Sequence, residues 1–114
     1  MGVKQIFNKK IGVLGGVGPW ASAYAVDLII QNAQWDYGAV KDEEYPRHAL
    51  VSEHFKGFGA KGIEQPDLVR TELFTHFGSL ELLKPDIAVI ACNSLHTYYS
   101  LIPLRILLSS HCFL

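Results

Sequence analysis

The sequence predicts an α/β fold in which helices cover both faces of a parallel sheet, all within a single domain. Three short, largely apolar runs, at residues 11–14, 48–52 and 87–91, have the character of buried strands. Two stretches with helical periodicity separate these runs, and strands that alternate with helices are joined by right-handed crossovers that make the sheet parallel. In such a sheet the catalytic groups lie at the carboxyl ends of the strands.

The first unit, near residues 10–34, is a strand, a glycine turn and a helix. Gly15 and Gly16 end the first apolar run. Pro19 suits the first position of a helix, where the N–H that it lacks would have no partner within the helix. Apolar residues then follow at helical spacing, so we expect the helix to fill the rest of this unit.

The next part of the chain is predicted to cross the surface, form the second strand and enter a loop. Residues 34–47 are polar and acidic with aromatic interruptions, which is typical of a surface connection. Residues 48–52 form the second strand. The glycine-rich residues 56–62 do not suit regular structure, and we expect a mobile loop there. Loops in this position often carry function.

The second helix is predicted to have Asp67 as its N-cap, directly after Pro66, and to end before Pro85. The third strand, at residues 87–91, follows that proline. Five apolar residues at helical spacing form the face of this helix that we expect to be buried: Val69, Leu73, Phe77, Leu80 and Leu83.

Composition excludes several classes of protein. Lys and Arg number 10 and Asp and Glu number 11, so the net charge is -1, which is too small to attract nucleic acid or an anionic membrane. The 2 cysteines are too few for a disulfide framework and lack the paired spacing of zinc sites. No signal peptide and no apolar run of membrane-spanning length is recognisable. We therefore expect a cytoplasmic protein with neither nucleic acid nor membrane as its partner.

The end of the chain is expected to leave an apolar edge. Residues 101–108 could form a fourth strand, but residues 109–114 are too few for a helix that would cover it. An uncovered apolar strand promotes association. We therefore expect a chain that ends early, and that forms a homodimer or pairs with a second lobe.

Residues 16–21, Gly-Val-Gly-Pro-Trp-Ala, fit the G-x-G-x-x-A fingerprint of dinucleotide sites. Pro19 removes an N–H that would otherwise point at a phosphate, and Trp20 adds bulk beside it, so both residues argue against a nucleotide. The alternative is a tight turn between strand and helix, which needs glycine for its backbone angles. Either interpretation leaves open whether a small anionic ligand also uses the turn.

Cys92 stands where the third strand ends and a helix is expected to begin, in the segment IAVIACNSLHTYY at residues 87–99. Asn93 and Ser94 are both good N-cap residues. The positive end of a helix dipole favours a thiolate, and free N–H groups at the same helix start could hold a carboxylate. Free cysteine is also among the most commonly buried residue types. Position alone leaves an inert and a reactive cysteine equally open.

His96 lies one helical turn beyond Cys92, and it could be a partner base, a group that supports the thiol through hydrogen bonds, a metal ligand or a structural residue. The other histidines have no zinc-like spacing, so we expect no metal. Glu53 and His54, at the end of the second strand, could face the same cleft or form a solvated pair. Ser94 lacks the G-x-S-x-G context of a hydrolase.

Two segments together resemble the aspartate/glutamate racemase family, whose members invert amino acids without a cofactor by means of two cysteines. Residues 10–19 are similar to the opening strand and glycine turn of the family, and residues 91–96 are similar to its Cys-Asn-Thr/Ser-x-His signature. The resemblance implies that Cys92 is one of two acid/base thiols acting on a small amino-acid or dicarboxylate ligand. It further implies that Asn93 and Ser94 bind the substrate carboxylate.

The same resemblance implies that Gly16, Val17 and Gly18 line the substrate pocket. Family members continue into a second lobe that carries another cysteine in a Gly-Cys-Thr-Glu motif, and Cys112 lacks that context. The chain also lacks the stretch ending in arginine that family members have after the second strand. The resemblance therefore covers a single truncated lobe with one catalytic base, which is expected to exchange an α-proton without inverting the carbon.

Two other functions remain open at this point. The chain could be a truncated remnant or binding module that retains a pocket for small carboxylates. It could also be a decarboxylase or cis/trans isomerase of dicarboxylates from the same superfamily, since these enzymes also use thiol chemistry on small acids.

Overall fold

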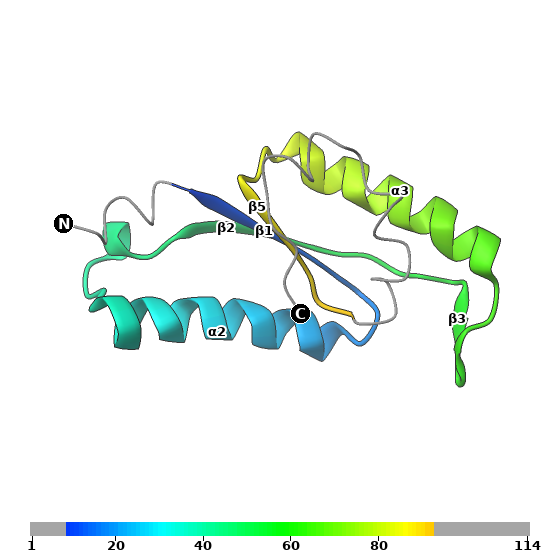
Figure 1. The fold of residues 1–114 in the computed structure, drawn as a ribbon, viewed down its shortest axis with the longest axis horizontal. Helices are drawn as coiled ribbons and strands as arrows, with labels where there is room; N and C mark the ends of the chain where they lie inside the picture. The colour runs from blue at the N-terminus through cyan, green and yellow to red at the C-terminus, as the bar shows by residue number, and fades with distance from the viewer. Residues whose placement is uncertain (1–8, 93–114) are drawn as a thin grey trace.

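The computed structural model describes residues 9–92, in which a three-stranded sheet lies between two long helices (Figure 1). The strands of the sheet are β1 (Lys10–Gly15), β2 (Arg47–Ser52) and β5 (Ile87–Ile90). The helices are α2 (Pro19–Tyr37) and α3 (Pro66–Leu82), with a 3-10 turn η1 (Asp42–Glu44) between α2 and β2. Two short strands, β3 (Phe58–Gly59) and β4 (Gly62–Ile63), precede α3.

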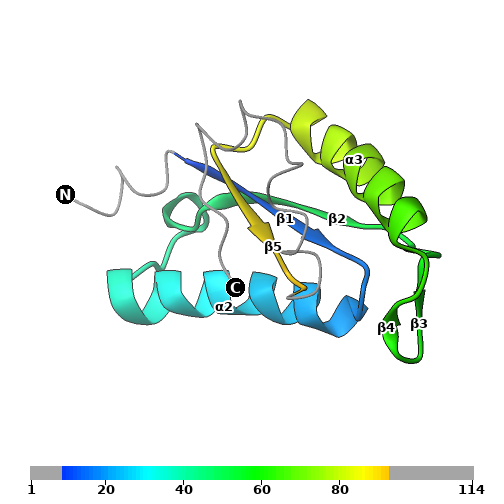
Figure 2. The ribbon, with the colours of Figure 1, turned by 45° about the vertical axis from the view of Figure 1, so that its right-hand side comes forward.

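The sheet is parallel and has the order β2-β1-β5, with β1 in the middle. Leu14 is in register with Val51 on one side and with Ile90 on the other. The connection through α2 carries the chain from β1 to β2 on one side of it, and the connection through α3 carries the chain from β2 past β1 to β5 on the other side. Right-handed crossovers in opposite directions place their helices on opposite faces, and Figure 2 shows the sheet between α2 and α3. The α/β prediction, including helices on both faces, is confirmed.

Neighbouring residues of the central strand pack into different halves of the core. Leu14 contacts the cluster beneath α3, whereas Val13 contacts the cluster beneath α2. The side chains of Ile90 and Val89 in β5 divide in the same way. A strand that is buried on both faces reads as a continuous apolar run, which is why the sequence located β1 and β5 to within one residue.

Helix α2 has a glycine at each end. Gly18, with φ of 73°, precedes Pro19 at the start, and Gly38, with φ of 71°, follows the last turn. The Ala39 N–H donates to the Ala33 carbonyl at 3.0 Å, which closes the end of the helix. The expectation that the surface connection begins at residue 34 was therefore wrong, because the helix continues to Tyr37 and the left-handed Gly38 ends it.

The glycine-rich residues 56–62 were expected to lack regular structure, and this was wrong. They contain β3 and the turn into β4, which pair antiparallel as a small hairpin with Phe58 opposite Ile63. Both side chains pack against the core cluster beneath α3. The Gly57 carbonyl also accepts hydrogen bonds of 3.0 Å from the N–H groups of Glu64 and Gln65. Contacts with distant residues therefore order a segment whose local propensity is poor.

The predicted buried face of α3 is correct at four of its five positions, since Val69, Leu73, Phe77 and Leu80 are almost completely buried. Leu83 is 41% exposed, because the helix ends at Leu82 and the backbone turns away there.

The start of α3 also differs from the expectation. Gln65 is the N-cap, and Asp67 lies inside the first turn. There its carboxylate still interacts favourably with the positive end of the helix dipole. Over residues 9–92, neither helix combines the length and apolar character that a transmembrane segment requires.

Candidate active site

The carboxyl ends of β1 and β5 lie side by side at the point where the strand order reverses. The chain leaves β1 toward the α2 face, whereas α3 brings it to β5 over the opposite face. The Ala91 N–H extends this pairing by donating to the Leu14 carbonyl at 2.9 Å. Ligands of open α/β sheets bind at such a reversal, outside the carboxyl ends of the strands. Cys92 and the glycine turn of residues 15–18 are both located there.

Two glycines of this turn are needed because neighbouring atoms leave no room for a side chain. A Cβ atom at Gly15 would overlap the side chain of Ser22, which is 1% exposed and whose hydroxyl donates to the Pro19 carbonyl at 2.9 Å. A Cβ atom at Gly16 would overlap the backbone carbonyl of Glu53, and the φ of Gly16 is 114°. The turn is therefore packed tightly against both α2 and the segment after β2.

Gly18 differs from these two glycines, because nothing lies within 4 Å of the position that its Cβ would occupy. Its φ of 73° alone explains the glycine. The predicted tight turn is thus present, with Pro19 as the first residue of α2. The N–H that a phosphate site would use at this position is missing, as the sequence indicated.

Cys92 is a free cysteine with a partly buried side chain. It packs against the core cluster beneath α3, and Val17 packs against the same cluster. The structure therefore brings the thiol and one predicted pocket residue to the same face at the same edge of the sheet. Gly16 is half-buried and Gly18 is exposed.

Four sequence-predicted residues lie outside the described residues: Asn93, Ser94, His96 and Cys112. The predicted fourth strand at residues 101–108 lies there as well. The roles assigned to these residues therefore stay predictions.

Glu53 and His54 follow β2 at the same edge, and both side chains are exposed. The backbone of Glu53 forms a wall against Gly16, and the His54 carbonyl lies 3.1 Å from Nε2 of His76 in α3. The pair therefore contributes backbone atoms to the edge, and its side chains are solvated. Across residues 9–92, no three His, Cys, Asp or Glu side chains gather as a metal site.

The start of α3 brings further polar residues to this edge that sequence reasoning missed. The Glu72 carboxylate accepts hydrogen bonds from the N–H groups of Lys56, at 2.5 Å, and Gly57, at 3.0 Å. Arg70 forms an ion pair with Asp67 one turn before it. The sequence shows Asp67 and Arg70 at a spacing that lets two side chains meet on a helix. On which side of the sheet the pair lies depends on the strand order.

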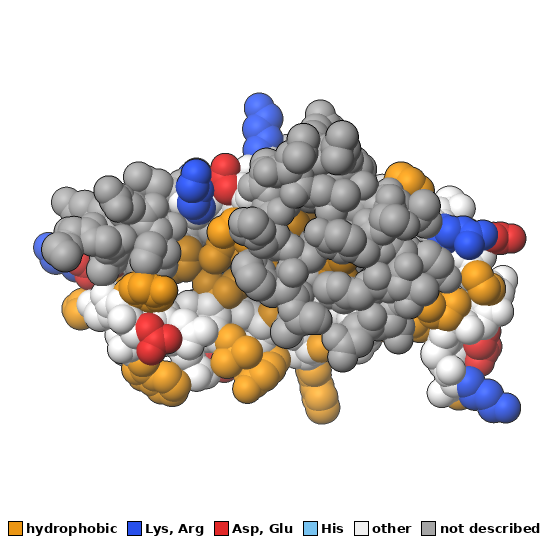
Figure 3. Space-filling view, viewed as in Figure 1, with side chains coloured by type: hydrophobic (Ala, Val, Ile, Leu, Met, Phe, Trp, Pro, Cys, Tyr) orange, Lys and Arg blue, Asp and Glu red, His pale blue; other side chains and the backbone are white. Residues whose placement is uncertain are grey.

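A cavity of about 320 Å³ lies on the opposite face of the sheet, between α2 and strands β1 and β5. Its lining is mainly apolar and includes Tyr24, Leu28, Ile87 and Val89. It contains neither Cys92 nor the glycine turn, so it is separate from the thiol. Figure 3 shows further hydrophobic side chains over α2, where Trp20 is 88% exposed and Trp35 is 72% exposed.

The fold and the edge described above define a parallel α/β lobe that carries a thiol beside a glycine turn at its switch point. No family model matches the chain. Among curated proteins, the broad specificity amino-acid racemase RacX of Bacillus subtilis (strain 168) is 29% identical over 89 residues, or 78% of this chain. The chain is related to the aspartate/glutamate racemase family over part of that family's length.

A solved structure supports the same fold. An aspartate racemase homologue from Pyrococcus horikoshii OT3 matches with a TM-score of 0.71 at 21% identity over 91% of this chain. The chain spans 39% of the length of RacX and 44% of the chain in that structure. Both relatives are thus more than twice as long as the segment that this chain matches.

Proposed function

We propose that this chain is the thiol-bearing lobe of an amino-acid racemase of aspartate or glutamate type, in which the thiolate of Cys92 removes the α-proton of the substrate. The observation that carries the proposal is the position of Cys92, one residue beyond the Ala91–Leu14 hydrogen bond and beside the glycine turn. Similarity to a broad specificity amino-acid racemase supports amino acids as substrates, and similarity to an aspartate racemase homologue supports the acidic ones. The fold supports the location, because it directs ligands to this edge.

The chemistry requires a base that faces the α-carbon. When the thiolate takes the proton, the S–H bond forms as the C–H bond breaks, and the electron pair stays on the α-carbon and spreads into the carboxylate. Asn93 and Ser94 are proposed to hold that carboxylate. Return of a proton from the thiol restores the same configuration, since one group reaches only one face of the carbon. Inversion needs a second acid on the other face.

Proton exchange in D₂O tests the proposal directly. The protein is incubated with each enantiomer of aspartate and of glutamate, the α-proton is followed by NMR, and enantiomers are separated by chiral chromatography. We expect loss of the α-proton signal for one enantiomer, with its chirality retained. Cys92→Ala should abolish the exchange, and Cys112→Ser is the matched control that should preserve it.

Other outcomes would contradict specific parts of the proposal. Exchange that survives Cys92→Ala would exclude the thiol as the base. Accumulation of both enantiomers, abolished by Cys92→Ala, would show that a second acid is available and that the one-base argument is wrong. Binding of aspartate without exchange would favour the binding module, whereas release of CO₂ or isomerisation of a dicarboxylate would favour the other members of the superfamily.

We also propose that the lobe acts in a pair, with a second copy or with a second lobe. A second lobe would supply the acid for the opposite face of the carbon, whereas a second copy of this chain brings another Cys92 and is not expected to restore inversion. Exposed aromatic residues along α2, including Trp20 and Trp35, support an associating surface. Native mass measurement across a range of protein concentrations tests this proposal, and a stable monomer throughout would contradict pairing of the isolated chain.

A further inference from the structure

Arg70 lies at the same edge of the sheet as Cys92. Helix α3 runs antiparallel to the strands, because it leaves the carboxyl end of β2 and returns to the start of β5. Its last turn accordingly lies near the amino ends of the strands, where Leu80 abuts Gly12 in the first half of β1. Its first turn lies beyond the carboxyl ends of the strands, where Val69 abuts Gly57, five residues after the end of β2. Arg70, next to Val69, is therefore on the carboxyl side of the sheet, the side on which Cys92 lies.

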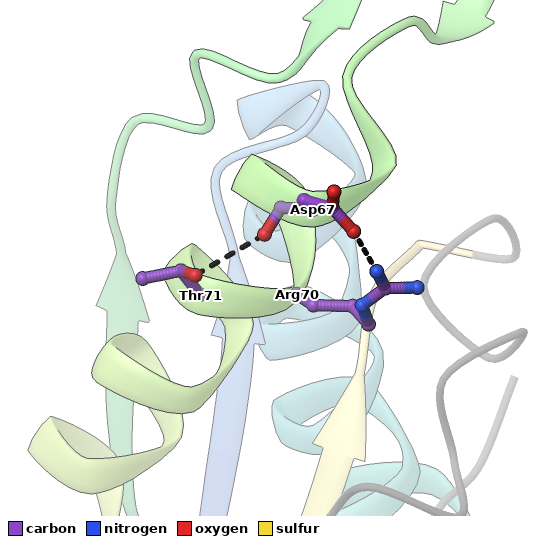
Figure 4. A network of polar contacts seen from close by, with 3 residues as sticks. All are labelled: Asp67, Arg70 and Thr71. Carbon is purple, nitrogen blue, oxygen red and sulfur yellow. Dashed lines mark hydrogen bonds and ion pairs between the residues drawn. The ribbon is translucent and has the colours of Figure 1, made fainter.

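Arg70 also lies on the flank of α3 that faces β5. Glu72 and His76 mark the opposite flank, since both contact backbone atoms of residues 54–57, which follow β2. Because β2 and β5 lie on opposite sides of β1, the other flank of the helix is turned toward β5. With 3.6 residues per turn, Arg70 is on that flank, across the buried stripe from Glu72. Figure 4 likewise shows the Arg70 guanidinium on the side of the helix where β5 ends.

The charge of Arg70 is held in place by its neighbour. One of its terminal nitrogens contacts the Asp67 carboxylate, as Figure 4 shows, while the Arg70 side chain is 43% exposed and that of Asp67 is 91% exposed. A guanidinium presents several N–H donors in a rigid fork that suits a carboxylate. Two other cations near this edge, Lys56 and Lys61, belong to the hairpin segment on the β2 side and are exposed.

We propose that Arg70 recognises the side-chain carboxylate of an acidic amino acid whose α-carbon lies at Cys92. This specificity role rests on the proposed function of Cys92 as the α-proton base. It favours aspartate or glutamate over neutral amino acids, because a neutral amino acid has no side-chain carboxylate for Arg70 to bind.

Alkylation of Cys92 reports the charge beside the thiol without any need for turnover. In a Cys112→Ser background, Cys92 is the sole cysteine. The measured quantity is the ratio of its reaction rates with iodoacetate, an anion, and iodoacetamide, its neutral analogue. Arg70→Gln should lower this ratio about three-fold or more, because the guanidinium attracts an anion that approaches the thiol. Arg47→Gln removes the same charge at the start of β2, the opposite edge of the sheet, and should leave the ratio unchanged.

Two further measurements separate recognition from structure. Asp67→Asn leaves Arg70 in place and removes its negative neighbour, so the ratio should rise. Aspartate should protect Cys92 from iodoacetamide at lower concentrations than alanine does, and Arg70→Gln should remove that advantage.

The outcomes distinguish the two proposals. If the ratio and the advantage of aspartate over alanine are the same in Arg70→Gln as in Arg47→Gln, the role of Arg70 is overturned while that of Cys92 stands. If neither amino acid protects Cys92 in any variant, the proposed function is overturned, and the recognition role with it. A lower ratio together with loss of the aspartate advantage supports both.

Discussion

The backbone N–H of Ala91 donates a 2.9 Å hydrogen bond to the carbonyl of Leu14. This bond joins the last residue before Cys92 to the last residue but one of β1, so the thiol and the glycine turn are fixed relative to each other by the sheet itself. The glycine turn forms the other side of this edge, and substitutions of its glycines test how tightly it packs.

Gly15→Ala should lower the free energy of unfolding by about 1–3 kcal/mol, because the new methyl group overlaps the buried side chain of Ser22. Chemical denaturation measures the loss. Gly78→Ala is the matched control, since a Cβ there meets nothing within 4 Å and α3 gains helix propensity, so stability should rise by about 0.5–1 kcal/mol. Equal stabilities of Gly15→Ala and the unmodified protein would contradict the tight contact.

Gly16→Ala and Gly18→Ala should differ even though both glycines have positive φ. Gly18→Ala should lower the free energy of unfolding by about 1–2 kcal/mol, through the strain of a positive φ alone. Gly16→Ala should cause a similar strain. Its methyl group also forces the turn away from the backbone carbonyl of Glu53, which cannot rotate away as a side chain would. We expect a total of about 2–4 kcal/mol. Urea denaturation compares the two, and a larger loss in Gly18→Ala would show that the turn does not pack on the segment after β2.

Glu72→Ala should loosen the segment between β2 and the hairpin. It removes the acceptor of the Lys56 and Gly57 N–H groups, and Gly57 is buried. The expected cost is about 1–3 kcal/mol, since a buried donor is left unpaired. Hydrogen exchange of these two amides should accelerate, whereas Thr75→Ala, which removes a hydroxyl from the exposed surface of α3, should leave them unchanged. Unchanged exchange in Glu72→Ala would mean that the carboxylate does not hold the segment.

Leu73→Ala and Phe74→Ala test the face that α3 presents to the sheet. Leu73 is 2% exposed, and its truncation should cost about 2–5 kcal/mol through lost burial and a cavity. Phe74, the next residue, is 50% exposed, and its truncation should cost about 1 kcal/mol or less. Thermal and urea unfolding give both values. A reversed order would place the wrong face of α3 against the core.

The main elements could be predicted because their signals are local. Gly15 and Pro19 mark the turn between β1 and α2, and the spacing of Val69, Leu73 and Phe77 marks the inner face of α3. The hairpin formed by β3 and β4 could not be predicted in this way. It depends on the carboxylate of Glu72 and on packing against the core cluster, and no window of a few residues contains those partners.

The candidate site could likewise be predicted only in part. Cys92 was identified from its place at a strand end, and the pairing of β5 with β1 locates it beside the glycine turn. Arg70 could not be assigned from sequence, because its helical spacing fixes only that it lies beside the buried stripe. Which flank of α3 faces β5 is decided by the order β2-β1-β5.

By itself, the sequence determined the alternation of strands and helices, the glycine turn and the cysteine at a strand end, because hydrophobic periodicity and backbone preference act between near neighbours. Only the tertiary structure decided the strand order, the approach of Gly16 to Glu53 and the side of α3 on which Arg70 lies. The physical reason is that these features arise from burial and hydrogen bonds between residues far apart in the chain, whose pairing no local pattern encodes.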